Sequence, residues 1–297
     1  MALTHNCYAV IEAGGTKFNC AIVDGHRRVL AEQRIATTTP GETLAQCVDF
    51  FAAQRQQGHH FARLGIASFG PLDLNPVSKT FGFITQTPKP FWSNTPLASH
   101  FEEALGVDVK IDTDVNAAAL AEYRWGAAQG TQVSVYVTVG TGVGGGLVIN
   151  GKPVHGAVHP EMGHMLVTPP QGQTGVCPFH ENCVEGLASG TALGKIWGQP
   201  SDTFGSDHPA WDGLADVLAQ FSHNILVTLS AEKIVFGGGV MQTPGLIERI
   251  VTRTNDYLKE YVVFPDGVAV DNILVLPGLE GQSGLFGALA LLDETGA

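Results

Sequence analysis

Residues 8–23 decide the fold, and they read YAVIEAGGTKFNCAIV. Apolar and β-branched residues fill both ends of this stretch, and Gly14-Gly15 interrupts it. Glycine adopts positive φ without steric cost, so two strands joined at such a pair predict a β-hairpin. The same organisation returns at residues 133–149, where the run GTGVGGG separates two further apolar runs. The chain therefore contains two units of strand, glycine-rich turn and strand.

Outside these two units, strand patterns alternate with helix patterns, which indicates an α/β architecture. The expected strands are 29–35, 64–67, 109–111, 233–236 and 273–276, and the expected helices are 42–57, 96–105, 115–125, 190–197, 214–229, 245–257 and 284–292. A length of 297 residues favours two domains. We expect a first domain at residues 1–115, completed by a C-terminal helix at about 280–297, and a second domain at residues 116–279.

Composition and charge exclude several classes of protein. The chain is 44% hydrophobic and 15% charged, as in a soluble globular protein with a large core. Its formal net charge of -12 repels phosphate backbones, so no nucleic-acid partner is expected. No apolar run reaches the ~18 residues of a membrane span, and Met1–Val10 lacks the pattern of a signal peptide. Cys7, Cys20 and Cys47 fit small core residues, which indicates a reduced, cytoplasmic protein.

A cluster of thiols and imidazoles follows the second strand unit. His164, Cys177, His180 and Cys183 lie within twenty residues, and they are the ligand set of a tetrahedral Cys₂His₂ zinc site. The alternative is a chance cluster of these residues in a loop rich in Pro and Gly. Because protein side chains fill all four positions, no position remains for a metal-bound water. The sequence therefore predicts one structural Zn²⁺ rather than a catalytic one.

Three glycine-rich turns, at Gly14-Gly15, 140–146 and 237–239, each follow a strand. Backbone N–H groups at such turns can approach an anion closely, although a single turn of this kind is usually only a turn. Three of them favour a phosphate site. None has the spacing of a P-loop, so a hairpin-based nucleotide site is expected. Lys17 is either a phosphate contact or an exposed hairpin lysine.

Asp114 follows a predicted strand and precedes a predicted helix. It is therefore either a helix N-cap or a carboxylate directed into a site, and both can hold. Phosphoryl transfer tolerates a weak base, because its transition state is loose and positioning matters more than basicity.

Other side chains have competing interpretations. Lys89 and Trp92 lie in the Pro-rich loop 87–92, which has no regular pattern and looks too irregular for core packing. A contact with substrate or with a second subunit is the functional alternative. His155 and His159 are interpreted as exposed loop histidines.

Four motifs together resemble the ROK family of sugar kinases and repressors, and most closely its bacterial fructokinase branch. In chain order they are EAGGTK at 12–17, DVNAAA at 114–119, GTGVGGG at 140–146 and EMGH at 161–164. The resemblance runs from about Tyr8 to Leu292. It implies the actin-like, ribonuclease-H-like ATPase fold, in which two α/β domains form a cleft for ATP and sugar.

The resemblance also implies roles for individual residues. Asp114 would take the proton from the sugar hydroxyl, and Glu12 would stand near the Mg²⁺ that accompanies ATP. The implied ATP contacts are Gly14, Gly15, Thr16, Lys17, Thr141, Gly142, Thr191, Gly237, Gly238, Gly239, Val240 and Met241. The implied sugar contacts are Asp114, Glu161, His164 and Glu185, although Glu185 is equally well a first-turn acid of a helix. The family also implies a homodimer.

Three departures from the family pattern bear on function. Glu12 stands where many members have Asp, Thr113 stands where many kinases have Asn, and His180 replaces a thiol of the usual zinc loop. Glu12 could alter the water-mediated contact with Mg²⁺, and Thr113 weakens a glucokinase assignment. The zinc loop with His180, together with residues 11–18 and 87–89, resembles the fructokinase branch.

With the four motifs, the resemblance implies ATP-dependent phosphorylation of D-fructose to fructose 6-phosphate. The alternatives are another hexose or N-acetylhexosamine kinase, such as a mannokinase or glucokinase, and, from a different class, a sugar-responsive transcriptional repressor. With nine residues before Val10, no room for an N-terminal helix-turn-helix is seen.

Overall fold

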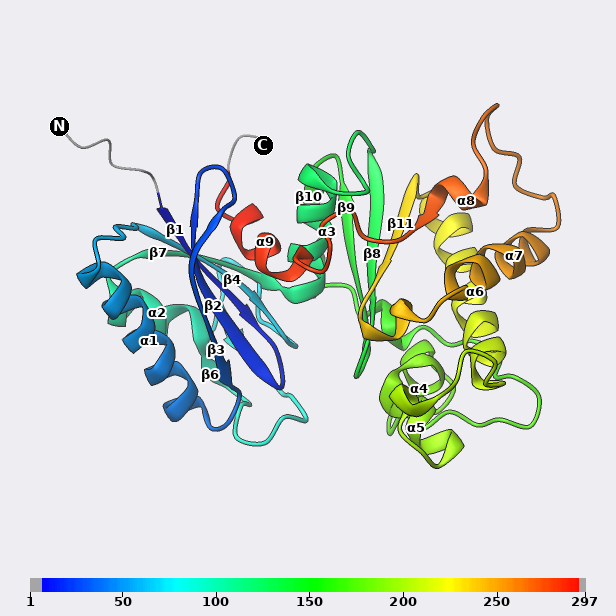
Figure 1. The fold of residues 1–297 in the computed structure, drawn as a ribbon, viewed down its shortest axis with the longest axis horizontal. Helices are drawn as coiled ribbons and strands as arrows, with labels where there is room; N and C mark the ends of the chain where they lie inside the picture. The colour runs from blue at the N-terminus through cyan, green and yellow to red at the C-terminus, as the bar shows by residue number, and fades with distance from the viewer. Residues whose placement is uncertain (1–6, 294–297) are drawn as a thin grey trace. The chain divides into compact units, whose positions relative to one another are not determined.

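The computed structural model describes residues 7–293, so the parts of our predictions that concern residues 1–6 and 294–297 lie outside the described residues. The chain forms two compact units, which we describe separately (Figure 1). Unit 1 comprises Met1–Arg124, Gly151–His159 and Gln282–Ala297, and unit 2 comprises Trp125–Asn150 and Pro160–Gly281. Each unit is built around one β-sheet.

The sheet of unit 1 combines three antiparallel strands, which include the hairpin, with two strands parallel to the first strand of the chain. Its strands, in spatial order, are β3 (Val29–Ala36), β2 (Lys17–Asp24), β1 (Cys7–Ala13), β4 (Arg63–Ser68) and β7 (Asp108–Thr113). β1 and β2 form the predicted hairpin around Gly14-Gly15. β1, β4 and β7 run parallel, and the register pairs Ala13 with Ser68 and Ser68 with Thr113. The carboxyl ends of these three strands therefore meet at one edge, where ligands of such sheets bind.

Helices cover both faces of this sheet (Figure 1). They are α1 (Pro40–Gln56), α2 (Leu97–Leu105), α3 (Asp114–Trp125) and α9 (Ser283–Ala290), and the short strand pair of β5 (Phe83–Ile84) with β6 (Thr95–Pro96) also belongs to unit 1. α1 and α2 enclose an aromatic core on one face. On the other face α9 lies against β4, so closely that a Cβ on Gly65 would stand 1.9 Å from the Ala288 carbonyl oxygen.

Trp92 belongs to the aromatic core, so the prediction that its loop is too irregular for core packing is wrong. The loop has no helix or strand, as expected, but Trp92 is fully buried. Its ring lies 5.3 Å from that of Phe18 and 5.6 Å from that of Phe69, and its indole N–H donates to the Thr38 carbonyl at 2.8 Å. An aromatic ring removes so much apolar area from water that it can anchor an irregular segment.

Unit 2 repeats the combination of hairpin and parallel strands. Its sheet has the strand order β10 (Lys152–Pro153, in the segment counted with unit 1), β9 (Val143–Ile149), β8 (Val133–Val139), β11 (Lys233–Gly237) and β12 (Leu274–Val275). β8 and β9 form the second predicted hairpin, and β11 runs parallel to β8 with Gly237 paired to Thr138. Its helices are α4 (Val184–Ala188), α5 (Gly190–Trp197), α6 (Ala210–Leu229), α7 (Leu246–Leu258) and α8 (Val270–Ile273), with short 3₁₀ turns η1 (Met162–His164), η2 (Ser201–Thr203) and η3 (Gly239–Gln242).

The first division between the units falls after Arg124, nine residues later than the expected boundary at residue 115. Helix α3 stays with unit 1 because it packs against α9. A Cβ on Gly287 would come within 2.6 Å of the Ala117 backbone, and the Ser283 hydroxyl donates to Glu122 at 2.7 Å. These contacts join residues far apart in the sequence, so no local pattern marks them.

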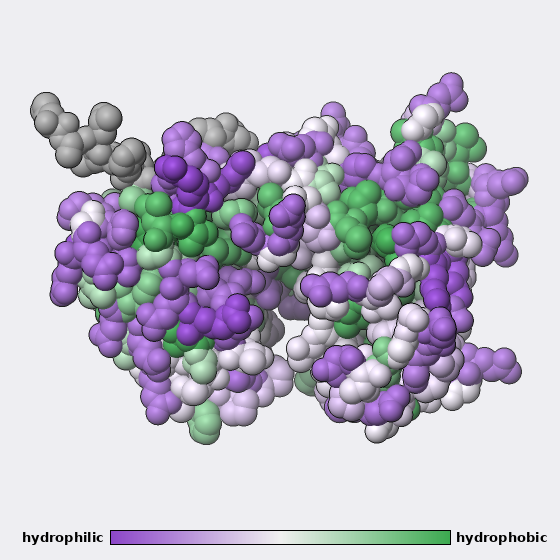
Figure 2. All heavy atoms as spheres, in the orientation of Figure 1, coloured by the Kyte–Doolittle hydropathy of each residue, from purple (hydrophilic) through white to green (hydrophobic). Residues whose placement is uncertain are grey.

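On the face that Figure 2 shows, polar residues predominate, and apolar residues gather over the upper part of the unit 1 sheet and near α8 and β11 of unit 2. Among the helices of residues 7–293, none has the length and apolar character needed to cross a membrane.

Candidate functional site

The glycine turn of unit 1 lies at the carboxyl edge of its sheet. The Gly14 N–H donates to the Lys17 carbonyl at 2.9 Å, and a Cβ at Gly14 would stand equally close to that oxygen. Thr37, just after β3, stabilises the turn, because its hydroxyl donates to the Gly14 carbonyl at 2.7 Å. Thr16 and Lys17 are exposed at the tip. The backbone is thus held in a tight turn whose outer side can approach an anion.

Asp114 lies at the same edge, where β7 becomes α3. The hydroxyl of Thr113 accepts a hydrogen bond from the Asn116 N–H at 3.1 Å, which is the N-cap interaction of this helix. The capping position therefore belongs to Thr113, and Asp114 is the first helical residue. Its Oδ1 accepts from the Val115 N–H at 2.9 Å, and its side chain is half-buried. Strand register thus brings Asp114 and the Gly14 turn to one edge of unit 1.

In unit 2, three of the predicted nucleotide segments come together. The Gly190 N–H donates to the Gly140 carbonyl, and the Thr191 hydroxyl donates to the Thr141 carbonyl, both at 2.7 Å. Val240 approaches the same point, because its Cγ2 would lie 3.5 Å from a Cβ on Gly190. The start of α5 is therefore fixed to the β8–β9 turn and to η3.

Gly238 allows the third turn to approach the second. It has a φ of 92°, and a Cβ on it would stand 2.3 Å from the Val139 carbonyl oxygen. Only a residue without a side chain fits there. The turn at Gly237–Met241 and the turn at Thr141-Gly142 are consequently neighbours in unit 2.

The EMGH motif is fixed to β9 through Val143. A Cβ on Gly163 would lie 1.8 Å from the Val143 carbonyl oxygen, so η1 can rest on β9 only with glycine at that position. On the other side of the same residue, the Val143 N–H donates to Oε2 of Glu185 at 3.0 Å. Glu161, His164 and Glu185 are thus held by a common strand. Glu185 lies in the first turn of α4, and one of its oxygens is already engaged by the glycine-rich turn.

The four predicted metal ligands form a compact group. One ligand atom from each of His164, Cys177, His180 and Cys183 lies within 4.8 Å of all the others. The Sγ of Cys183 is 3.6 Å and the Sγ of Cys177 is 3.9 Å from Nδ1 of His164, and Cys177 Sγ is 3.7 Å from Nδ1 of His180. Tetrahedral zinc with bonds of about 2.3 Å to sulfur and about 2.0 Å to nitrogen separates such atoms by about 3.6 Å. The donor set and its spacing therefore fit this metal.

Burial is the largest cause of the raised pKa of Cys183, about 11, and the neighbouring Cys177 raises it further while the Gly186 N–H opposes the shift. The Gly186 N–H donates to Cys183 Sγ at 3.3 Å, so this sulfur also caps α4. A thiol must lose its proton to bind a metal, and metal binding here would release one.

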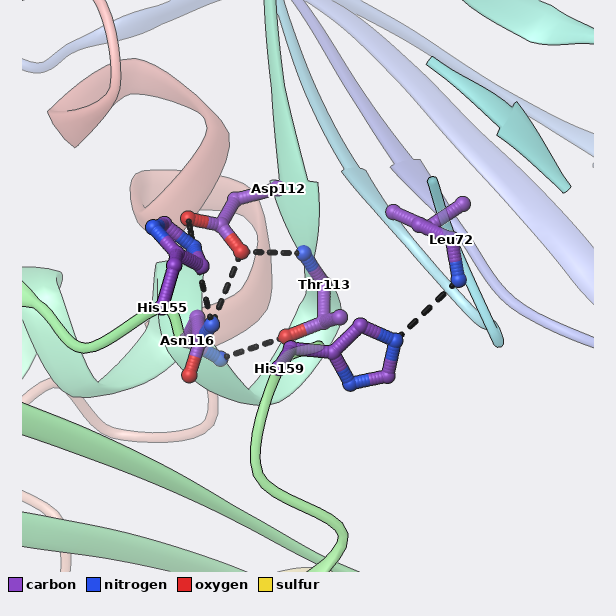
Figure 3. A network of polar contacts seen from close by, with 6 residues as sticks. All are labelled: Leu72, Asp112, Thr113, Asn116, His155 and His159. Carbon is purple, nitrogen blue, oxygen red and sulfur yellow. Dashed lines mark hydrogen bonds and ion pairs between the residues drawn. The ribbon is translucent and has the colours of Figure 1, made fainter. Parts of the chain in front are cut away.

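Two histidines of the segment Gly151–His159 join a polar network in unit 1 (Figure 3). His159 is buried, and its Nε2 accepts from the Leu72 N–H at 3.1 Å, so the prediction that it is an exposed loop histidine is wrong. The side chain of His155 is 39% exposed, but its Nε2 lies 2.9 Å from Oδ2 of Asp112. Leu72 is 87 residues away from His159 in sequence. The one local hint was that both histidines closely precede the EMGH motif.

Comparison with known proteins adds to this geometry. The profile of the ROK family matches residues 8–295. A fructokinase from Zymomonas mobilis is 49% identical over 290 residues, which cover 96% of this chain and 95% of that protein. A fructokinase from Lactococcus lactis is 40% identical over 273 residues, or 91% of each chain. The structure of a ROK family glucokinase from Streptomyces griseus, in complex with glucose and AMPPNP, matches with a TM-score of 0.71 at 25% identity over 95% of this chain and 98% of that one.

Proposed function

The chain belongs to the ROK family, and on this premise we propose that it phosphorylates D-fructose with ATP to give fructose 6-phosphate. Its fold is that of the ROK sugar kinases, the actin-like ATPase fold with two domains, as the family resemblance implied. The observation that carries the choice of sugar is the 49% identity to a fructokinase along nearly the full length of both chains.

In unit 1 we assign Asp114 as the base that accepts the proton of the attacking sugar hydroxyl. Its place at the carboxyl edge of the sheet, which it shares with the end of β1 across the intervening strand β4, supports this role. The turn at Gly14, Gly15, Thr16 and Lys17 would receive phosphate oxygens through backbone N–H groups and the side chains at its tip. Positioning of the hydroxyl and the γ-phosphate, more than basicity, accounts for rate in such a transfer.

Mg²⁺, which the kinase relatives imply, would neutralise phosphate charge during the transfer. Glu12 is the carboxylate at the end of β1 that we assign to it, through water. Its Oε2 accepts from the Asn19 amide at 2.7 Å, so the side chain is already oriented.

In unit 2 we assign Thr141, Gly142, Thr191 and Gly237–Met241 to ATP, because the structure joins these segments around the β8–β9 turn. Glu161, His164 and Glu185 would bind sugar hydroxyls. His164 presents Nδ1 to the two sulfurs, so its Nε2 is the ring nitrogen assigned to the sugar. Glu185 would both bind sugar and hold the Val143 N–H.

We assign Zn²⁺ to His164, Cys177, His180 and Cys183 as a structural ion. Four protein ligands complete a tetrahedral shell, so the role of this group is to fix the loop that carries Glu161 and His164. The family resemblance further supports a cytoplasmic homodimer, and sedimentation equilibrium would test the dimer.

The function is tested by measuring ADP formed from ATP in the presence of fructose, mannose, glucose or N-acetylmannosamine. We expect the largest kcat/KM with fructose, and a larger value with another sugar would move the assignment to a different kinase of the family. The Asp114→Asn variant should lose activity by about 10²–10⁴-fold, as when a general base is removed, and still bind ATP and sugar. Sequence-specific binding of DNA by the purified protein without sugar-dependent ADP formation would favour a repressor.

A further inference from the structure

The carboxylate of Asp112 joins three segments of unit 1 (Figure 3). Its Oδ1 accepts from the Thr113 N–H at 2.7 Å and from the Asn116 side-chain amide at 2.8 Å. Its Oδ2 lies 2.9 Å from Nε2 of His155, which comes from the separate segment Gly151–His159. One carboxylate therefore connects the end of β7, the first turn of α3 and this segment.

Asp114 lies inside the corner that these bonds enclose. It follows Asp112 by two residues and precedes Asn116 by two. Both neighbours are buried, with Asp112 3% and Asn116 1% exposed, and the Thr113 hydroxyl adds the cap to the same turn. Any movement of the Asp112 carboxylate is consequently transmitted to the backbone that carries Asp114.

The segment Gly151–His159 is held at two points. His155 contacts Asp112, and His159 accepts from the Leu72 N–H. The chain then continues through Pro160 directly to Glu161. The residues that brace the corner of Asp114 thus belong to the stretch that leads into the assigned sugar-binding motif.

A buried carboxylate is costly unless opposite charge and hydrogen bonds compensate it. The cavity of about 260 Å³ that Asp112 and His155 line in unit 1 is also lined by Arg124 and Lys152. Arg124 pairs with Asp293 at 3.4 Å and donates to the Ala290 carbonyl, whereas His155 contacts Asp112 directly. The imidazole is therefore the cationic group best placed to compensate Asp112.

We propose that His155 is a positioning residue for phosphoryl transfer, which acts through Asp112 to hold the β7–α3 corner in the geometry that Asp114 requires. This role rests on the proposed role of Asp114 as base. Loss of His155 should lower kcat more than it weakens ATP binding, because the assigned nucleotide contacts come from other segments.

The contact should depend on pH in a defined direction. The hydrogen bond to Asp112 is the largest cause of the raised pKa of His155; burial opposes the shift, and the charge of Asp112 adds to it. A raised pKa means that the ionic contribution is complete below the ordinary histidine value of about 6.5 and is lost as pH rises through the raised value. Positioning by a charged His155 thus predicts a fall of kcat on the alkaline side.

The test compares the full-length variants His155→Ala, His155→Gln and Asp112→Asn with the exposed-histidine control His60→Ala. Misplacement of a reacting group can cost about 10²-fold, so we expect His155→Ala to lower kcat by about 10–100-fold with the KM for ATP nearly unchanged. His155→Gln, which keeps a donor without charge, should recover part of kcat and show no alkaline fall as pH rises above about 6.5. The double variant His155→Ala/Asp112→Asn should be no slower than the slower single variant, because both changes remove one interaction.

Several outcomes would overturn the role of His155: a wild-type kcat in a folded His155→Ala protein, additive effects of the two substitutions, or an alkaline fall that persists in His155→Gln. Thermal melting of each variant shows that it is folded. Asp114→Asn is measured in parallel to separate the two proposals. If Asp114→Asn is inactive and His155→Ala is normal, only the role of His155 fails. If Asp114→Asn keeps its activity, the assignment of the base itself fails.

Discussion

At the scale of single residues, Glu12 has a longer side chain than the aspartate of many family members, and a glycine leaves the space for it. Its Oε2 is held by the Asn19 amide, and a Cβ on Gly284 would stand 2.1 Å from its Oε1. Glu12 therefore extends toward the first turn of α9, where Gly284 leaves the space for it. The extra methylene of Glu12, relative to aspartate, is therefore accommodated by a glycine that lies 272 positions later in the chain, at residue 284.

This match predicts that Gly284→Ala displaces the Glu12 carboxylate and weakens Mg²⁺ binding in the nucleotide complex. We expect a several-fold higher Mg²⁺ concentration for half-maximal activity, and a smaller Mg²⁺-dependent rise in melting temperature with ADP. Shortening the acid in the double variant Glu12→Asp/Gly284→Ala should restore part of both.

The control is Gly41→Ala in the first turn of α1, where an added Cβ meets no atom within 4 Å. Alanine is favoured over glycine in helices by about 1 kcal/mol, so neither variant should unfold through helix propensity. An unchanged Mg²⁺ titration in Gly284→Ala would show that Glu12 does not depend on this contact.

At the scale of elements, the loop from Pro160 to Cys183 is held by close backbone contacts and by its Cys/His group. Gly175 and Gly186 both approach the Glu181 carbonyl, with distances of 2.0 and 2.2 Å for an added Cβ. Cys177 and Cys183 are buried, whereas His180 and Phe179 are exposed. Such a loop has little apolar area of its own, and a metal can supply the missing stability.

Loss of the metal should therefore affect the sugar more than the nucleotide. We expect Cys183→Ser, or treatment with a zinc chelator, to lower the melting temperature and to raise the KM for fructose by about 10–100-fold, as when the support of a metal-held site is removed. Added Mg²⁺ should not restore either property. The measurements are metal content by mass spectrometry, thermal melting and steady-state kinetics, with Cys7→Ser as the control outside the group. A zinc-free protein with normal melting and a normal KM would contradict a structural role.

Most helices and strands could be predicted from the sequence. The hairpins around Gly14 and 140–142 were predictable because apolar, β-branched runs separated by glycine turns are local signals. Helices such as α6 were predictable from apolar spacing, with ends that differ by a few residues: 214–229 was expected and Ala210–Leu229 is found. Helix α4 was missed, since five residues carry too little periodicity.

The site could be predicted where its residues lie close together in the sequence. It was harder to predict where folding brings distant segments into contact. The four Cys and His side chains lie within twenty residues, and the structure brings them together as expected. The bond from Leu72 to His159 and the pair of His155 with Asp112 join distant segments. No local pattern reports such contacts, which is why the burial of His159 and the pairing of the exposed His155 with Asp112 were not predicted.

At the scale of the whole molecule, the chain passes between its two units four times, after Arg124, Asn150, His159 and Gly281. Unit 1 is therefore incomplete until the last helix has been added. Helix α9 contributes Leu285, Phe286 and Leu289 to the core, each 9% exposed or less, and Ala288 packs against β4. Unit 2, by contrast, is complete at Gly281.

This connectivity predicts that truncation after Gly281 unfolds unit 1 and spares the sheet of unit 2. Burial of one large apolar side chain contributes about 1.5–3 kcal/mol, so the three lost with α9 approach the 5–15 kcal/mol that stabilises a typical domain. Hydrogen exchange followed by mass spectrometry should show lost protection in β1 and β4 and retained protection in β8 and β11. Truncation after Asp293, which keeps α9, is the control and should leave both sheets protected. If β1 and β4 stay protected without α9, unit 1 folds independently of the C-terminal helix.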